Sequence, residues 1–113
     1  MNQNDLIREI VGTYQKHGWQ LRGVLLRPET QTEINVASLP AELGTAKAAE
    51  IDALWFARPS HGEREAWELR LLAENPFALF ETFEKDETEE QRAEMRREME
   101  ARMRDYANKS DER

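Results

Sequence analysis

Residues 51–72, IDALWFARPSHGEREAWELRLL, decide the fold because they hold two apolar segments on either side of a turn. The turn is the Pro-Ser-His-Gly cluster at residues 59–62, whose residue types favour loop geometry. After it, residues 63–72 alternate, with one tryptophan and two leucines on the same face, as a half-buried strand does. Residues 51–58 fit both the helical and the strand period, and the adjoining turn favours a strand. We therefore expect a β-hairpin.

The segment before the hairpin contains a helix and one or two further strands. Apolar residues within 5–17 recur on one helical face, and Gly18 suits the helix end. Residues 19–27 then alternate with period two, which predicts a strand. Residues 30–37 alternate again, so we expect a second strand that is antiparallel to the first. The alanine-rich residues 41–50 are expected to form a loop with a short helical turn.

The segment after the hairpin is predicted to be helical. An Asn-Pro pair at residues 75–76 is typical of a helix start, and apolar residues follow at helical spacing as far as Phe83. This pattern predicts one or two turns of helix. The main helix is expected to run from Thr88, where Thr-Glu-Glu-Gln forms a capping box, to about Tyr106.

These elements predict an α+β fold: an antiparallel sheet of three or four strands, with the N-terminal helix and the long charged C-terminal helix packed mainly on one face. One domain is expected over residues 1–107, followed by a frayed polar tail at 108–113. The face expected to hold the core carries Trp19, Leu21, Leu25, Trp55, Trp67, Leu69 and Leu71. The second face is also apolar, so either residues 77–83 or a partner must cover it. Its apolar residues are Val24, Leu26, Leu54, Phe56 and Leu72.

Composition excludes several classes of function. The 113 residues carry a net charge of −7, which disfavours binding to nucleic acid and to anionic membrane surfaces. The absence of cysteine excludes disulfides and thiolate metal sites. No segment is apolar over the ~20 residues needed to cross a bilayer. The scattered glycines form no phosphate-binding loop. We expect a cytoplasmic protein without a cofactor.

His61 is the weak candidate for a catalytic residue. Its pKa near neutrality suits acid–base chemistry, and Ser60 and Glu63 are its neighbours in sequence. The competing interpretation is an exposed hairpin tip, where such residues collect for turn geometry alone, and we favour it. A metal site is not expected, because His17 and His61 are the only histidines and have no paired spacing.

Three arginines are weak candidates for binding an anionic ligand. In the predicted sheet, Arg22, Arg58 and Arg70 share one face, and an arginine there can hold a carboxylate or phosphate in a pocket between sheet and helices. Asp52 and Glu68 lie on the same face, so cross-strand ion pairs are the alternative.

The C-terminal helix carries a narrow apolar stripe between charged flanks. The stripe can pack on the sheet of its own chain, with methionine filling gaps, or it can contact a second copy or another protein. Together with two residues of the second sheet face, it supplies the candidate interface: Met95, Met99, Met103, Tyr106, Leu54 and Phe56.

Three hypotheses about function follow. The first is a non-enzymatic protein-interaction or regulatory domain, whose partner is another protein or a second copy in a homodimer. The second is a domain that binds a small anionic ligand. The third, and the least supported, is an enzyme that uses His61.

Overall fold

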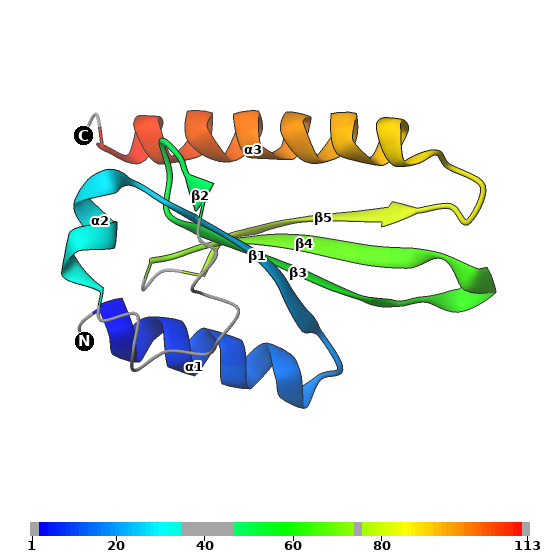
Figure 1. Ribbon diagram of the computed structural model, residues 1–113, viewed down its shortest axis with the longest axis horizontal. Helices are drawn as coiled ribbons and strands as arrows, with labels where there is room; N and C mark the ends of the chain where they lie inside the picture. Colours follow the sequence, from blue (N-terminus) through cyan, green and yellow to red (C-terminus); the bar gives the residue numbers. More distant parts are fainter. Residues whose placement is uncertain (1–2, 35–46, 74–75, 112–113) are drawn as a thin grey trace.

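The computed structural model describes residues 3–34, 47–73 and 76–111. Five strands, two long helices and two short helical segments follow one another along the chain (Figure 1). They are α1 (Gln3–Lys16), β1 (Gln20–Leu26), α2 (Pro28–Glu33), β2 (Lys47–Ala48), β3 (Ala53–Pro59), η3 (His61–Glu63), β4 (Glu65–Leu71), β5 (Ala78–Phe83) and α3 (Glu89–Asp111).

The fold is α+β, but its layers differ from those predicted. The sheet has five strands in the order β2-β1-β3-β4-β5, and it is mixed because β2 runs parallel to β1. The prediction of a purely antiparallel sheet of three or four strands was therefore wrong. Figure 1 shows α1 and α3 on opposite faces of the sheet, so the placement of both helices on one face was also wrong.

The two helices account for both apolar faces of the sheet. On the α1 side the buried residues are Ile7, Ile10, Val11, Trp19, Leu21, Val24, Leu26, Ile34, Leu54, Phe56, Ala66 and Leu72. On the α3 side they are Leu25, Ile51, Ala53, Trp55, Leu69, Met99 and Met103. The second face therefore needs neither a partner nor residues 77–83 as its main cover, because α1 lies on it.

The predicted hairpin is confirmed, as strands β3 and β4. Ala53 pairs with Leu71 at one end and Pro59 with Glu65 at the other, without a register shift. The tip contains two residues with positive φ, Gly62 (67°) and Glu63 (63°). The glycine adopts this conformation at no steric cost, which explains its place in the turn.

The two long helices are also confirmed. α1 ends before Gly18, whose φ of 85° supplies the left-handed residue expected there. At the start of α3 the capping box is formed: Gln91 N–H donates to Thr88 Oγ1 (3.1 Å), and Thr88 N–H donates to Gln91 Oε1 (2.9 Å). α3 continues to Asp111, beyond the expected end at Tyr106. The domain boundary at residue 107 stays a prediction.

A β-bulge in β1 changes which face its first residues occupy. Leu21 pairs with Phe56 but Gly23 pairs with Trp55, so Arg22 is an extra residue in the strand. The side-chain alternation shifts by one position at this point. Trp19 and Leu21 therefore lie on the α1 side, not on the same face as Leu25 as the uninterrupted alternation predicted.

Two further segments differ from the predictions. Residues 78–83 form strand β5, paired with β4, where helical turns were expected. Residues 28–33 form helix α2, with Pro28 in its first turn, although a second antiparallel strand was expected to begin at residue 30. Residues 35–37 of that predicted strand and residues 41–46 of the predicted loop lie outside the described residues, and residues 47–48 of the loop form strand β2. Across the described ranges, no helix has the length and apolar character needed to cross a membrane.

Candidate functional site

His61 lies at the exposed tip of the β3–β4 hairpin, in η3. With Gly18, Arg58 and Ser60 it lines a shallow hollow of about 370 Å³. The described residues that line this hollow include no carboxylate to orient the imidazole for acid–base catalysis. In the described part of the chain, no group of three or more His, Asp or Glu side chains is arranged to hold a metal ion.

The structure does not bring the three candidate arginines together. Arg22 is exposed at the β1 bulge. The Arg58 guanidinium lies 4.7 Å from the centre of the Trp19 ring and donates from Nη1 to the carbonyl oxygen of His17 (3.0 Å). Arg70 Nη1 donates to the carbonyl oxygens of Leu71 and Ala73.

Of the three, Arg70 lies in a cavity between α1 and the sheet. The cavity has a volume of about 520 Å³ and is lined by Leu6, Glu9, Ile10, Thr13, Tyr14, Arg70 and Pro76. More of its wall is apolar than polar, and Glu9 shares the lining with the arginine. An anionic ligand at this position stays a prediction.

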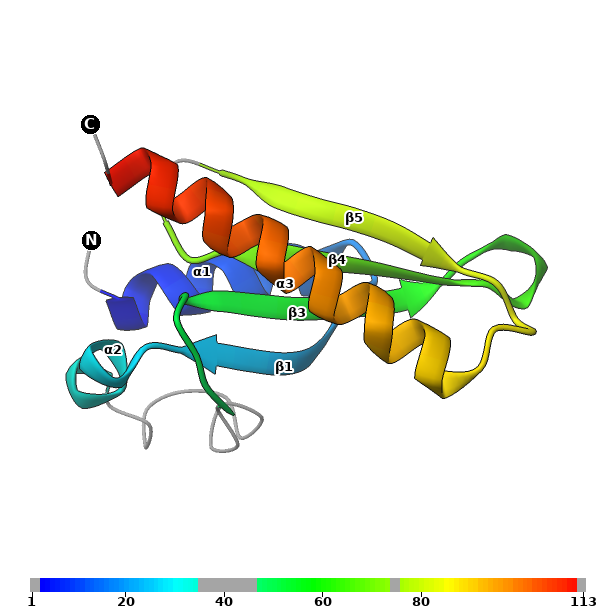
Figure 2. The same cartoon turned by 90° about the horizontal axis from the view of Figure 1, so that it is seen from above.

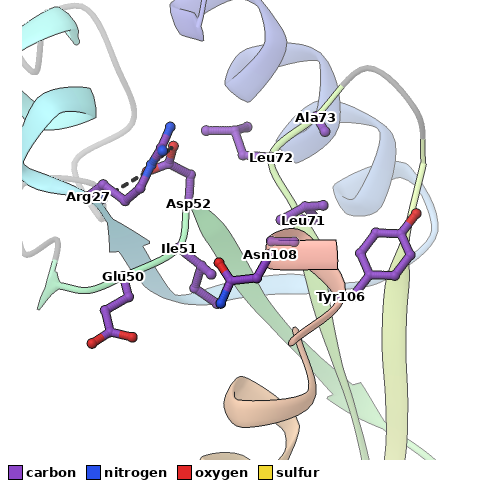
Figure 3. A pocket seen from close by; sticks show the side chains of 10 residues that line it. Arg27, Glu50, Ile51, Asp52, Leu71, Leu72, Ala73, Tyr106 and Asn108 are labelled. Carbon is purple, nitrogen blue, oxygen red and sulfur yellow. Dashed lines mark hydrogen bonds and ion pairs between the residues drawn. The ribbon is translucent and has the colours of Figure 1, made fainter. Parts of the chain in front are cut away.

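A second cavity, of about 310 Å³, lies where β1, β3 and β4 meet the end of α3 (Figure 3). Its most buried polar group is the carboxylate of Asp52. That carboxylate accepts hydrogen bonds from Arg27 N–H (2.8 Å), Arg27 Nε (3.2 Å) and the hydroxyl of Thr30 (2.7 Å). Asp52 therefore stabilises the connection between β1 and α2, and both of its carboxylate oxygens already accept hydrogen bonds there.

The candidate interface residues differ in how much surface they present. Leu54 and Phe56 have no exposed surface, because they lie beneath α1. Met99 and Met103 are 1% and 0% exposed, since the stripe of α3 packs on the sheet. Met95 is half-buried beside this cluster. Tyr106 keeps 37% of its surface exposed, with its ring stacked on Phe77. Only Met95 and Tyr106 of the six thus offer appreciable surface to a partner.

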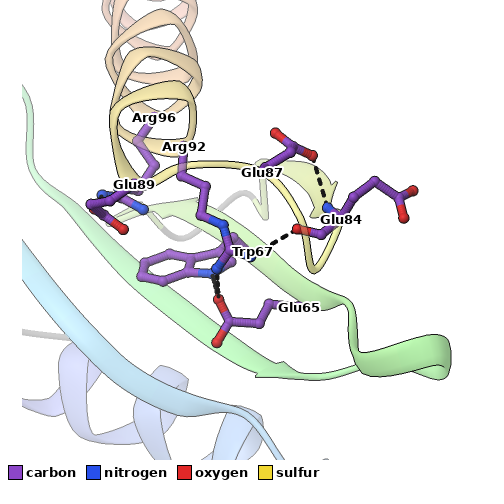
Figure 4. Close-up of polar contacts among 7 residues, drawn as sticks. All are labelled: Glu65, Trp67, Glu84, Glu87, Glu89, Arg92 and Arg96. Carbon is purple, nitrogen blue, oxygen red and sulfur yellow. Dashed lines mark hydrogen bonds and ion pairs between the residues drawn. The ribbon is translucent and has the colours of Figure 1, made fainter.

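Two arginines fasten the first turns of α3 to the sheet (Figure 4). Arg92 Nη1 donates to Glu65 Oε1 (2.8 Å), and its Nη2 donates to the carbonyl oxygen of Glu84 (2.8 Å). The Arg96 guanidinium lies 4.9 Å from the centre of the Trp67 ring, a cation–π contact. Since both guanidinium groups are engaged in contacts within the chain, this cluster is a structural attachment and not an open binding site.

Tyr14 connects α1 to strands β3 and β4 of the sheet. Its hydroxyl donates a hydrogen bond to Glu68 Oε2, and its ring stacks on Phe56 with 4.0 Å between centroids. Burial, together with this hydrogen bond to Glu68, raises the pKa of the Tyr14 phenol well above its ordinary value. The proton therefore stays on the tyrosine, which acts as a donor and not as a base.

β5 is an open margin of the sheet, as Figure 2 shows. Among the described strands, β4 is its only hydrogen-bonded neighbour. α1 does not extend over it, and Phe80 on that side is 57% exposed, more than any other large apolar side chain described. The Phe80 ring contacts Trp19 edge-on, with 6.4 Å between centroids.

The hydrogen-bond pattern shows which backbone groups of β5 face outward. Leu71 N–H donates to the carbonyl oxygen of Phe77 (2.9 Å), and this pair continues the β4–β5 register. In an antiparallel pair, hydrogen-bonded positions alternate, so the odd-numbered residues of β5 direct their backbone groups to β4. Those of Ala78, Phe80 and Thr82 point away from the sheet. Consistent with this, Thr82 N–H reaches the side chain of Glu81 (3.3 Å) and not β4.

None of the sequence-predicted candidates lies in β5, because that segment was expected to be helical. The alternation of Ala78, Phe80 and Thr82 against Leu79, Glu81 and Phe83 was the signal that could have identified it. Comparison of the chain with protein-family models, with curated proteins and with solved structures finds no match.

Proposed function

We propose that this chain is a non-enzymatic protein-interaction domain that binds an extended segment of a partner along the outer edge of β5. Two features together carry the proposal. The backbone N–H and carbonyl groups of Ala78, Phe80 and Thr82 point away from the sheet, and the Phe80 ring, at the middle of the three, is exposed. An added strand would gain main-chain hydrogen bonds from these residues and apolar contact from the ring.

The composition of β5 supports this proposal. Sheet edges are usually protected by short strands, prolines, lysines, bulges or a covering element. β5 is six residues long, has no bulge in its pairing with β4, and contains neither proline nor lysine. Its one charged residue is Glu81. These features suit an edge that accepts a partner strand.

The neighbouring cavity supplies a means of selecting the partner. Arg70 pairs with Ala78 in the sheet and also lines the cavity between α1 and β4. A side chain of an added strand, placed beside Ala78 and directed to the α1 side, would therefore lie next to this cavity. Since the walls are mainly apolar, we expect a preference for an apolar side chain at that position.

A selection from a random library of nine-residue peptides, on dilute immobilised protein, tests the proposal. The matched variants are Ala78→Pro, which removes an outward N–H, and Ala78→Ser, which keeps it. Proline is tolerated where the strand N–H faces solvent, so Ala78→Pro should fold. Peptides that bind the wild type and Ala78→Ser, but not folded Ala78→Pro, would support edge binding. A selection that yields no peptide with this discrimination would reject the proposal.

A further inference from the structure

We infer that the strand added to β5 is β5 of a second copy of this chain, which pairs antiparallel about a two-fold axis that passes beside Phe80. This inference rests on the proposed function, because it names the occupant of the same edge. A two-fold axis places identical residues opposite each other at the centre, and antiparallel pairing of identical strands satisfies that symmetry.

The backbone pattern selects the register. When Phe80 lies opposite Phe80 of the second copy, each residue donates its backbone N–H to the carbonyl oxygen of the other. On each side of the axis, Ala78 of one chain and Thr82 of the other exchange a pair of backbone hydrogen bonds in the same way. Three hydrogen-bonded pairs result. An axis at Leu79 or at Glu81 leaves only two such pairs within β5, and the axis at Glu81 also places two carboxylates opposite each other. Phe80 is therefore the favoured centre.

The side chains fit this register. The two Phe80 rings become cross-strand neighbours on the α1 side, where each is now 57% exposed and rests against Trp19. On the α3 side, Leu79 faces Glu81 of the second copy, so the only charged residue of β5 is opposed by an apolar one. The net charge of −7 opposes self-association in general, and Glu81 is the one charged residue within β5 itself.

One contact in the single chain competes with pairing. The Glu81 carboxylate accepts the outward N–H of Thr82 at 3.3 Å, a long hydrogen bond. Pairing replaces it with the carbonyl oxygen of Ala78 from the second copy. The donor is thus satisfied in both states, and Glu81 must rotate away before the strands join. We expect Glu81→Ala to increase the dimer fraction at a given protein concentration.

Sedimentation equilibrium measures the association directly. We expect the wild type and Ala78→Ser to reach twice the 13.2 kDa of the single chain at submillimolar concentration. Folded Ala78→Pro should remain at the mass of one chain. A wild type that stays monomeric at that concentration would overturn the inference, and so would a dimer that persists in folded Ala78→Pro.

Cysteine cross-linking tests the register and does not depend on the proline variant. The chain contains no cysteine, so Ala78→Cys and Thr82→Cys each introduce a single thiol. Opposed residues in a hydrogen-bonded pair have Cα atoms about 5.5 Å apart, within the range that a disulfide spans. When the two variants are mixed and oxidised, the thiol of the Ala78→Cys chain should therefore join the thiol of the Thr82→Cys chain. Two thiols at the same position, one in each copy, would be four residues out of register, or roughly 13 Å apart along the strand. They should not form a disulfide.

The outcomes separate the two proposals. A mixed disulfide that forms in preference to either symmetrical one supports the Phe80-centred pair. Equal yields of all disulfides, or none, would overturn it. If the peptide selection succeeds while the wild type is monomeric, edge binding stands and the second copy is rejected as its occupant. If dimers form but resist Ala78→Pro, both the register and the edge are rejected as the site of self-association.

Discussion

Replacing Met103 with alanine tests how α3 is held on the sheet. Met103 is 0% exposed and lies in the buried cluster with Trp55 and Leu69. Alanine and methionine both favour helices, so the substitution removes packing and leaves helix propensity almost unchanged. The same change at Met95, which is half-buried at the side of this cluster, provides the matched control.

The expected loss follows from burial. Truncating a fully buried methionine to alanine costs about 2–5 kcal/mol, depending on how far the surroundings close the cavity. α3 lies on one face of the sheet and can settle toward it, so we expect about 3 kcal/mol for Met103→Ala. For a domain of this size that loss lowers Tm by roughly 10–20 °C. Met95→Ala should cost less than about 1 kcal/mol, because much less apolar surface is removed from burial.

Urea unfolding followed by circular dichroism measures both variants, with the m value checked for equality to the wild type. The mass of the folded species should not change, since Met103 offers no surface outside the chain. A loss below about 0.5 kcal/mol for Met103→Ala, or equal losses at the two positions, would refute the packing of α3 described above.

Three other substitutions test separate parts of the fold. Trp67→Ala should lower the free energy of unfolding by about 3 kcal/mol, because the ring contacts Trp55 and Phe83 and lies under Arg96. The expected loss is not larger, since the ring is only partly buried. Near-native stability in urea would contradict this. Asp52→Ala should cost about 2–4 kcal/mol, since it leaves the buried Thr30 hydroxyl and Arg27 N–H without their acceptor; a Tm within error of the wild type would show that water replaces the carboxylate. Because the pKa of Tyr14 is raised in the folded state above its ordinary value of 10.0, its contribution to stability is complete below pH 10 and is lost as the pH rises further. In Tyr14→Phe, stability should therefore fall less as the pH rises above 10 than it does in the wild type. If the free energy of unfolding changes with pH equally in the two proteins between about pH 8 and pH 11, the raised pKa of Tyr14 is disproved.

Elements with local signals were predictable from the sequence. α1 follows from its apolar period and Gly18, the hairpin from its turn cluster, and the start of α3 from the Thr88–Gln91 capping box, which the structure forms as expected. In each case the deciding interaction lies within a few residues of the pattern that predicted it.

The missed elements depend on residues far away in the sequence. The alternation of residues 30–37 predicts a strand, but Thr30 lies in α2 and its hydroxyl donates a hydrogen bond to Asp52, 22 positions later. β5 satisfies the helical spacing, and its pairing with β4 overrides that local pattern. The bulge at Arg22 has no marker in the sequence apart from the adjacent Gly23.

The sequence contains one signal for the arrangement of the sheet between two helices. Residues 53–57 of β3, Ala-Leu-Trp-Phe-Ala, are continuously apolar, as in strands that are buried on both faces. All five are buried in the structure. Such a run indicates a strand covered on both sides, and hence helices on opposite faces of the sheet. The edge of β5 could not be inferred in the same way, because a strand order is not contained in any single segment.

The two margins of the described sheet are unlike each other, and this difference bears on the size of the assembly inferred above. Among the described strands, the margin opposite β5 consists of the two-residue β2 and of β1, whose pairing with β3 contains the bulge at Arg22. A sheet that can extend at both margins can grow without limit into a fibre, whereas one with a single receptive margin stops when that margin is filled. In the pairing inferred above, the β5 margin of each chain is filled by that of the other, so the joined sheet would stop at two chains and would not polymerise.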